Sequence, residues 1–141
     1  MGKRHNAIFL ERYMELDKLC CEKFGVNTGS GVIEYINRLS NARFAPGRDE
    51  VLSRLIGYSN TQKRFHYEPG AMRGDNQITS YDIKWIVKFK RQLARRRDPI
   101  SRYLKRARNY AFRRRLTGIL WGTLLIALAA ALIALAFALK S

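Results

Sequence analysis

The sequence predicts an all-α protein, a four- to five-helix antiparallel bundle followed by one long C-terminal helix that becomes transmembrane. Apolar residues in the first hundred positions recur every three or four residues, which is typical of amphipathic helices, and no stretch alternates as a strand does. Glycine and proline separate these stretches, so short turns should connect the helices. Residues 117–139 then run for 23 positions without a charged side chain.

The first helix is expected over residues 6–24. Its apolar face consists of Phe9, Tyr13, Leu16, Cys20 and Phe24. The rest of its surface should face water and carries Glu11, Arg12, Glu15, Asp17 and Lys18. Gly25 ends the helix, and a polar loop follows over residues 26–31.

A second helix is expected over residues 32–42, and a third over residues 50–67 after a turn at residues 43–48. The apolar face of the second consists of Val32, Ile33, Ile36 and Leu39, and Glu34 pairs with Arg38 on its wet side. The third buries Val51, Leu52, Leu55, Ile56, Tyr58 and Phe65. Its residues 59–64, SNTQKR, are a poor core stripe.

Glu68-Pro69-Gly70 stops the third helix, and the segment up to Gln77 is expected to be an exposed loop. Thr79 and Asp82 resemble a capping box, in which each side chain bonds the backbone N–H of the other. A fourth helix should therefore run from here to about residue 97. Its buried residues are expected to be Ile83, Trp85, Ile86, Val87 and Leu93.

Asp98 and Pro99 form a second helix start, with Asp98 as the cap and Pro99 in the first turn, where its missing N–H has no effect. We expect one continuous helix from Pro99 to about Leu139. Its last 23 residues would reach ~35 Å, enough to cross a ~30 Å hydrocarbon layer. They lack the polar stripe expected of the alternative, a buried core helix of a soluble domain.

The net charge of +16 is unevenly distributed. Residues 1–75 hold 12 basic and 9 acidic side chains, whereas residues 84–115 hold 14 basic ones and only Asp98. Lys and Arg beside a membrane helix favour the cytoplasmic side, so we expect a single-pass protein of the cell membrane with a cytoplasmic N-terminus. The predicted domains are a cytoplasmic helical domain (1–98), a basic juxtamembrane helix (99–116) and a transmembrane helix (117–139).

The basic juxtamembrane helix is expected to bind anionic lipid headgroups or another polyanion. The cations in question are Arg102, Lys105, Arg106, Arg108, Arg113, Arg114 and Arg115. Nucleic acid is the alternative, because aromatic residues that stack on bases are interleaved with the cations: Trp85, Phe89, Tyr103, Tyr110 and Phe112. Lipid is favoured because the basic run leads directly into the span, where Tyr110, Phe112 and Trp121 would lie near the interface.

Gly118 and Gly122 form a small-xxx-small pattern within the span, which would let two helices approach closely in a homodimer.

Cys20 and Cys21 are adjacent on a helix, a geometry that disfavours an ordinary disulfide, and are expected to be thiols at the edge of the core. With only two histidines, His5 and His66, no metal site is expected, and no cofactor motif is present. Nor does the N-terminus have the pattern of a secretory signal peptide.

The segment from about Tyr13 to Arg108 resembles a family of small, uncharacterised helical proteins of gut-dwelling Gram-positive bacteria that are similar to HEPN domains. The likeness rests on YMELDKLCCEKFGV, GVIEYINRL, APGRDEVLSRL, HYEPGA, ITSYDIKWIVKF and RRDPISRYLKRAR. It implies a compact helical bundle, often dimeric and sometimes capable of metal-independent RNA cleavage. In such nucleases an Arg followed by a polar residue precedes a His by a few positions.

Here the matching His is His66, and the polar position holds Gln62, but Thr61 stands where the Arg is expected. Cleavage needs a general acid or base and a cation that stabilises the transition state, and only the first is offered. His66 is otherwise a structural histidine near the helix end. We therefore expect no catalysis.

Together, these features predict a tail-anchored membrane protein whose cytoplasmic helical domain binds a partner. A membrane-held HEPN-like domain that binds or cleaves RNA is the alternative. A small accessory subunit of a membrane complex, held by a protein partner, is a third class.

Overall fold

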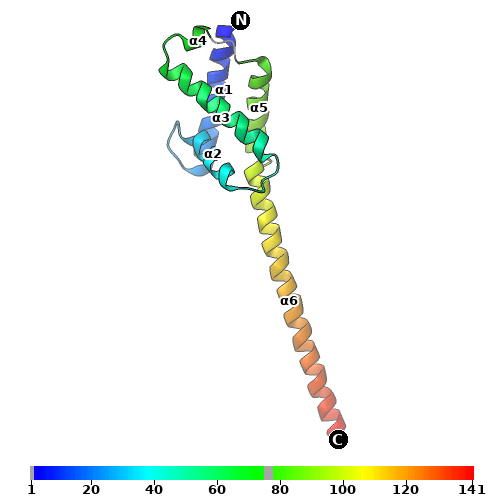
Figure 1. Cartoon of the computed structure of the whole chain (residues 1–141). Coiled ribbons are helices and arrows are strands. Elements are labelled where there is room, and N and C mark those ends of the chain that lie inside the picture. The colour runs from blue at the N-terminus through cyan, green and yellow to red at the C-terminus, as the bar shows by residue number, and fades with distance from the viewer. Residues whose placement is uncertain (1, 75–77) are drawn as a thin grey trace. The chain divides into compact units, whose positions relative to one another are not determined.

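The computed structural model describes residues 2–74 and 78–141, and within them it contains six α-helices and no strand. The helices are α1 (Gly2–Phe24), α2 (Gly31–Asn41), α3 (Arg48–Tyr67), α4 (Ala71–Gly74), α5 (Ser80–Ala94) and α6 (Pro99–Lys140) (Figure 1). The predicted all-α class is confirmed. The chain divides into two compact units, residues 1–103 and residues 104–141, which are described separately below.

Helix α1 is the centre of the first unit, because α2, α3, α4 and α5 all pack against it (Figure 1). Its predicted core residues Phe9, Tyr13, Leu16 and Cys20 are buried. Phe9 is fully buried, and its ring meets those of Tyr58 and Phe65 on α3 edge-on at centroid distances of 5.8 and 6.0 Å. The three-to-four-residue spacing thus identified the face of α1 that builds the core.

The prediction that Asp17 faces water was wrong. Asp17 is 6% exposed and accepts hydrogen bonds from the backbone N–H groups of Gly29 (2.8 Å) and Val32 (3.0 Å). Its carboxylate thereby caps the N-terminus of α2, whose own N-cap residue, Ser30, makes no side-chain cap bond. A helix start buried in a core needs such an acceptor, because its first N–H groups have no partner within the helix.

Helix α2 buries most of the predicted face, because Val32 and Leu39 are buried and Ile36 packs against the core. Tyr35 is fully buried between Val32 and Leu39, whereas Ile33, expected in the core, is 37% exposed. Tyr35 is favoured in the interior because its ring packs there while its hydroxyl has a buried acceptor, Asp98. On α3, Ile56 was likewise expected to be buried but is 42% exposed. The predicted Glu34–Arg38 pair is present at 2.7 Å.

Helix α3 ends at Tyr67, as the Glu68-Pro69-Gly70 signal predicts. The loop expected after it is partly helical, because residues 71–74 form α4. Met72 of α4 packs against the core, and its carbonyl accepts a 2.8 Å hydrogen bond from the side-chain amide of Asn6. This contact with α1 explains why the segment is ordered as a helical turn. The remainder of the expected loop, residues 75–77, lies outside the described residues.

Helix α5 begins with the predicted capping box. The Thr79 hydroxyl accepts from the Asp82 N–H, and the Asp82 carboxylate accepts from the Thr79 N–H at 2.9 Å. The helix ends at Ala94, three residues before the expected end, and Arg96 takes a left-handed backbone conformation with φ of 54°. This break lets the chain turn before the next helix begins.

Asp98 closes the junction between α5 and α6 and is fully buried. Its carboxylate accepts from the backbone N–H of Ser101 at 3.2 Å, which confirms the predicted cap. It also accepts from Lys23 Nζ at 3.3 Å and from the Tyr35 hydroxyl at 2.8 Å. The first turn of α6 is therefore bonded to both α1 and α2.

The second unit, residues 104–141, consists of the rest of α6, and its side chains are exposed throughout. Among the described residues, α6 is the one helix whose length and composition suit a membrane crossing. The predicted continuity of this helix from Pro99 is confirmed, and it ends at Lys140.

Two helical glycines should respond oppositely to alanine. A Cβ at Gly31 would lie 2.7 Å from the Cys21 backbone nitrogen, so Gly31→Ala should lower the free energy of unfolding by about 2 kcal/mol or more. At Gly57, inside α3, a Cβ would meet nothing within 4 Å, so Gly57→Ala should raise it by about 0.5–1 kcal/mol. Both changes in the free energy of unfolding can be measured by urea unfolding of the full chain in mild detergent. The signal is the fluorescence of Trp85, recorded in a Trp121→Phe background so that Trp121 does not contribute. Equal effects of the two substitutions would contradict this packing.

Candidate functional site

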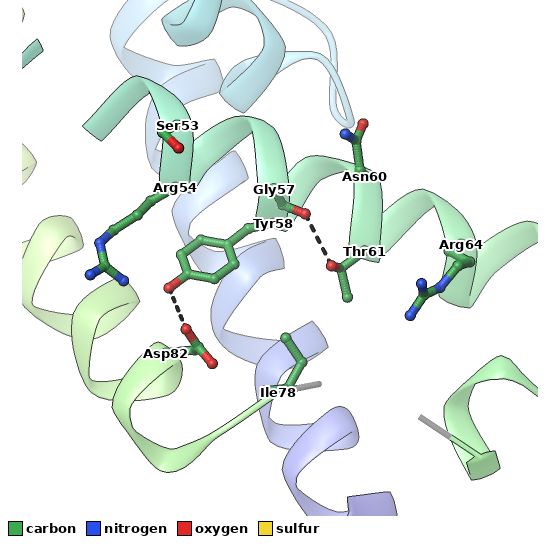
Figure 2. Close-up of a pocket in the computed structure, with 9 residues that line it drawn as sticks. All are labelled: Ser53, Arg54, Gly57, Tyr58, Asn60, Thr61, Arg64, Ile78 and Asp82. Atoms are coloured by element: carbon green, nitrogen blue, oxygen red, sulfur yellow. Dashed lines mark hydrogen bonds between the residues drawn. The ribbon is translucent and has the colours of Figure 1, made fainter. Parts of the chain in front are cut away.

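The polar middle of α3 lines a cavity of about 510 Å³ (Figure 2). Each of the residues Ser53, Gly57, Asn60, Thr61 and Arg64 lies three or four positions from another of the set, so they share one side of the helix. The remaining lining residues are Arg54, Tyr58, Ile78 and Asp82. Three residues of the stretch predicted to be a poor core stripe, Asn60, Thr61 and Arg64, therefore line the cavity, whereas Ser59 of the same stretch is buried.

One wall of the cavity is a hydrogen-bonded pair, Tyr58 and Asp82. The Tyr58 hydroxyl donates to Asp82 Oδ1 at 2.8 Å, while Asp82 Oδ2 accepts from the Thr79 N–H and hydroxyl at 2.9 and 2.8 Å. Burial, together with the bond to Asp82, raises the pKa of Tyr58 to about 12. For Asp82, burial alone would raise the pKa, but the bonds from Thr79 and Tyr58 outweigh it and lower the pKa. The carboxylate is therefore ionised and already has three donors.

Two guanidinium groups line the cavity, and Figure 2 shows Arg54 and Arg64 at its opposite ends, with Tyr58 and Thr61 between them. Arg54 lies over the ring of Tyr81, 5.0 Å from its centroid, and forms a 3.4 Å ion pair with Glu50. Sequence reasoning did not assign a role to either arginine. The one sequence feature that indicated this site was the helical spacing of the polar residues on α3. That spacing shows that they share a face, but not which other residues complete the cavity.

The predicted catalytic candidates do not line this cavity. His66 is exposed in the last turn of α3, where its ring contacts that of Tyr67 at a centroid distance of 4.9 Å. Gln62 lies one turn before it and is half-buried. Thr61, at the position expected to hold an Arg, does line the cavity, and its hydroxyl donates to the Gly57 carbonyl at 3.0 Å. RNA cleavage by His66 with Gln62 stays a prediction.

The basic juxtamembrane residues are all exposed on α6: Arg102, Lys105, Arg106, Arg108, Arg113, Arg114 and Arg115. No acidic residue occurs anywhere in this helix, so no neighbour within the helix compensates these charges. Tyr110, Phe112 and Trp121 are 71, 62 and 63% exposed. A helix with this composition can attract a polyanionic surface and place amphipathic rings beside it.

Part of the predicted base-stacking set is wrong. Phe89 is 2% exposed, stacks on Trp85 at 5.1 Å and meets Tyr35 edge-on at 5.3 Å. Trp85 and Tyr103 pack against the core as well. Tyr110 and Phe112 are the members of the set that are exposed. The aromatic residues of α5 thus hold the bundle together, which leaves the nucleic-acid alternative with fewer stacking partners.

Neither the cysteines nor the acidic residues form a metal site in the part of the chain that the structure describes. Cys20 and Cys21 are both free and buried, and burial raises the pKa of Cys20 to about 12. Within the span, a Cβ at Gly118 or Gly122 would meet nothing within 4 Å. Self-association through these glycines stays a prediction.

The fold and these surfaces define a class of protein: a small helical bundle continuous with an apolar helix that is long enough to cross a membrane. The chain belongs to a family of unknown function, DUF6548, whose profile matches residues 7–117. No curated protein and no solved structure matches the chain. The family match covers the bundle and the basic segment and ends where the uncharged run begins. Similarity to HEPN domains stays a prediction.

The Asp82 network predicts a pH dependence. Asp82→Asn should lower the free energy of unfolding at pH 7 by about 1–2 kcal/mol, because the carboxylate is both a helix-start acceptor and the partner of Tyr58. Since folding lowers the pKa of Asp82, its contribution is present above the unfolded pKa of ~3.9 and is lost as pH falls through the folded value. The difference between wild type and variant should therefore shrink below about pH 4.

Urea unfolding at several pH values measures this difference. Glu22→Gln is the matched control, since Glu22 is an exposed carboxylate on α1 and its loss should change the free energy of unfolding by less than ~0.5 kcal/mol. A gap between wild type and Asp82→Asn that stayed constant down to pH 2 would contradict the proposed network.

Proposed function

We propose that this protein is a single-pass membrane protein in which α6 anchors a cytoplasmic helical interaction domain. The observation that carries the proposal is the distribution of charge along α6. Seven exposed cations lie between Arg102 and Arg115, and no charged residue follows before Lys140. Such a helix is favourable in a bilayer along its apolar part and at an anionic surface along its basic part.

The orientation follows from the side on which the cations lie. Lys and Arg close to a membrane helix remain in the cytoplasm, and here they precede the span. The bundle, residues 1–98, would then be cytoplasmic, and the basic segment, residues 99–116, would contact anionic headgroups. Each Lys or Arg close to such a surface contributes about 1 kcal/mol of attraction.

The bundle is proposed to act by binding rather than by catalysis. Support comes from the placement of His66, which is exposed beside Tyr67 and lies outside the cavity. A larger membrane complex that includes this chain as an accessory subunit would use the same anchor. Cleavage of RNA by the purified full-length protein, abolished by His66→Ala, would overturn the binding proposal in favour of the HEPN-like alternative.

The anchor predicts how the chain fractionates. Full-length protein should remain in the membrane pellet after carbonate and salt washes and should require detergent for release. A variant that lacks residues 118–139 should be released by the salt wash, because its remaining attachment is electrostatic and is screened. Recovery of the full-length chain in the soluble fraction would refute the anchor.

The cations predict the orientation. An N-terminal epitope should be shielded from protease added outside intact cells. Combined substitution of Arg113, Arg114 and Arg115 by Gln should increase the fraction of digested epitope, because much of the positive charge that favours the cytoplasmic side is removed. The matched control replaces three exposed cations of α5, Lys84, Lys88 and Arg91, by Gln and should leave the epitope shielded. The same digestion in both triple variants would contradict the role assigned to the juxtamembrane arginines.

A further inference from the structure

The cavity on α3 is not explained by membrane anchoring. It is an open surface pocket of about 510 Å³, large enough to hold a small molecule. It lies entirely in the first unit, between the polar face of α3 and the start of α5. Its function must therefore be inferred from its own lining residues.

The helix that lines the cavity is not optimised for stability there. Gly57 lies inside α3, where glycine is less favourable than alanine by about 1 kcal/mol, and no atom within 4 Å of its missing Cβ explains the choice. Ser53, Asn60 and Thr61, on the same face, are also weaker helix formers than alanine. A polar face with a small residue at its centre suits a bound molecule better than it suits packing.

The charge of the lining indicates the class of molecule. Arg54 and Arg64 contribute two guanidinium groups, of which that of Arg54 is also paired with Glu50 at 3.4 Å, and the carboxylate of the lining, Asp82, accepts from Tyr58 and Thr79. Arginine binds phosphate through paired N–H donors, and such charge-assisted bonds are about twice as strong as neutral ones. Asn60 and Thr61, between the arginines along α3, and Ser53, next to Arg54, add amide and hydroxyl groups to the lining.

The position of the two arginines indicates the shape of the molecule. Arg64 lies ten positions after Arg54, which is a rise of ~15 Å along α3, and Figure 2 shows the two at opposite ends of the cavity. Because both arginine side chains have long stems, two linked phosphate groups could contact one guanidinium group each, whereas a single phosphate would contact one of them. We propose that the cavity binds a small soluble compound that carries more than one phosphate group.

Inorganic tripolyphosphate is a suitable probe. It is titrated into the full-length chain in zwitterionic detergent, and binding is followed by backbone amide chemical shifts, because the cations of α6 also attract polyphosphate and only a local signal separates the two. The expected shifts are in residues 53–64 and 78–82. Shifts confined to residues 102–115 would refute the proposal.

Matched variants on one helix test whether the geometry matters. Arg64→Gln should weaken binding at residues 53–64 by ~10–100-fold, the loss expected for a charge-assisted contact. Lys63→Gln removes the same charge from the neighbouring, exposed position that does not line the cavity, and should weaken binding by less than ~3-fold. An equal loss of tripolyphosphate affinity in both variants would show that binding is a non-specific electrostatic attraction and would overturn the proposal.

Gly57→Ala provides a test that does not alter charge. The variant should fold, because nothing obstructs the added methyl, yet the methyl would enter the cavity and weaken tripolyphosphate binding several-fold. Unchanged affinity would contradict binding at this face of α3.

A last experiment reconstitutes the chain with phosphatidylserine and no added phosphate compound. Shifts in residues 53–64 there would make a lipid headgroup the ligand and refute a soluble one.

Discussion

A fully buried carboxylate, that of Asp98, is the constraint on which the rest of this structure depends. A carboxyl group removed from water is strongly unfavourable unless hydrogen-bond donors surround it, and Asp98 has three, from Lys23, Tyr35 and the backbone of Ser101. These donors belong to α1, α2 and α6. The start of the long helix is therefore bonded to α1 and α2, which makes it part of the bundle.

The same solution is used a second time at Asp17. Both aspartates supply the acceptor that a buried helix start requires, but Asp98 caps the helix that follows it directly, whereas Asp17 caps α2 from the middle of α1. A cap supplied by another helix fixes how the two helices approach each other. Gly31 is the residue that permits that approach, because a Cβ there would lie 2.8 Å from the Cys21 sulfur. Polar groups thus determine the packing of α1 on α2 as much as apolar ones do.

Features that depend on neighbouring residues could be predicted from the sequence, whereas features that depend on contacts between distant helices could not. The core face of α1, the box of Thr79 with Asp82, and the start at Asp98 were predictable, because each depends on residues within a few positions of one another. The burial of Asp17 and Tyr35 was not, since their partners lie 15 and 63 residues away. Of the cavity, only the side formed by α3 could be predicted from the sequence. The polar stretch of α3 was visibly unsuited to a core, but only the fold shows that Asp82 closes the other side.

The two basic surfaces differ in a way that salt can separate. The cations of α6 are exposed over their whole length, and no acidic residue occurs in their helix, so their attraction to headgroups is long-ranged and screened over ~8 Å at physiological ionic strength. Those of α3 line a cavity, and contact with a ligand there would be made at hydrogen-bond distance, where added salt has less effect. The proposed attachment through α6 should therefore weaken with added salt more than the proposed binding in the cavity.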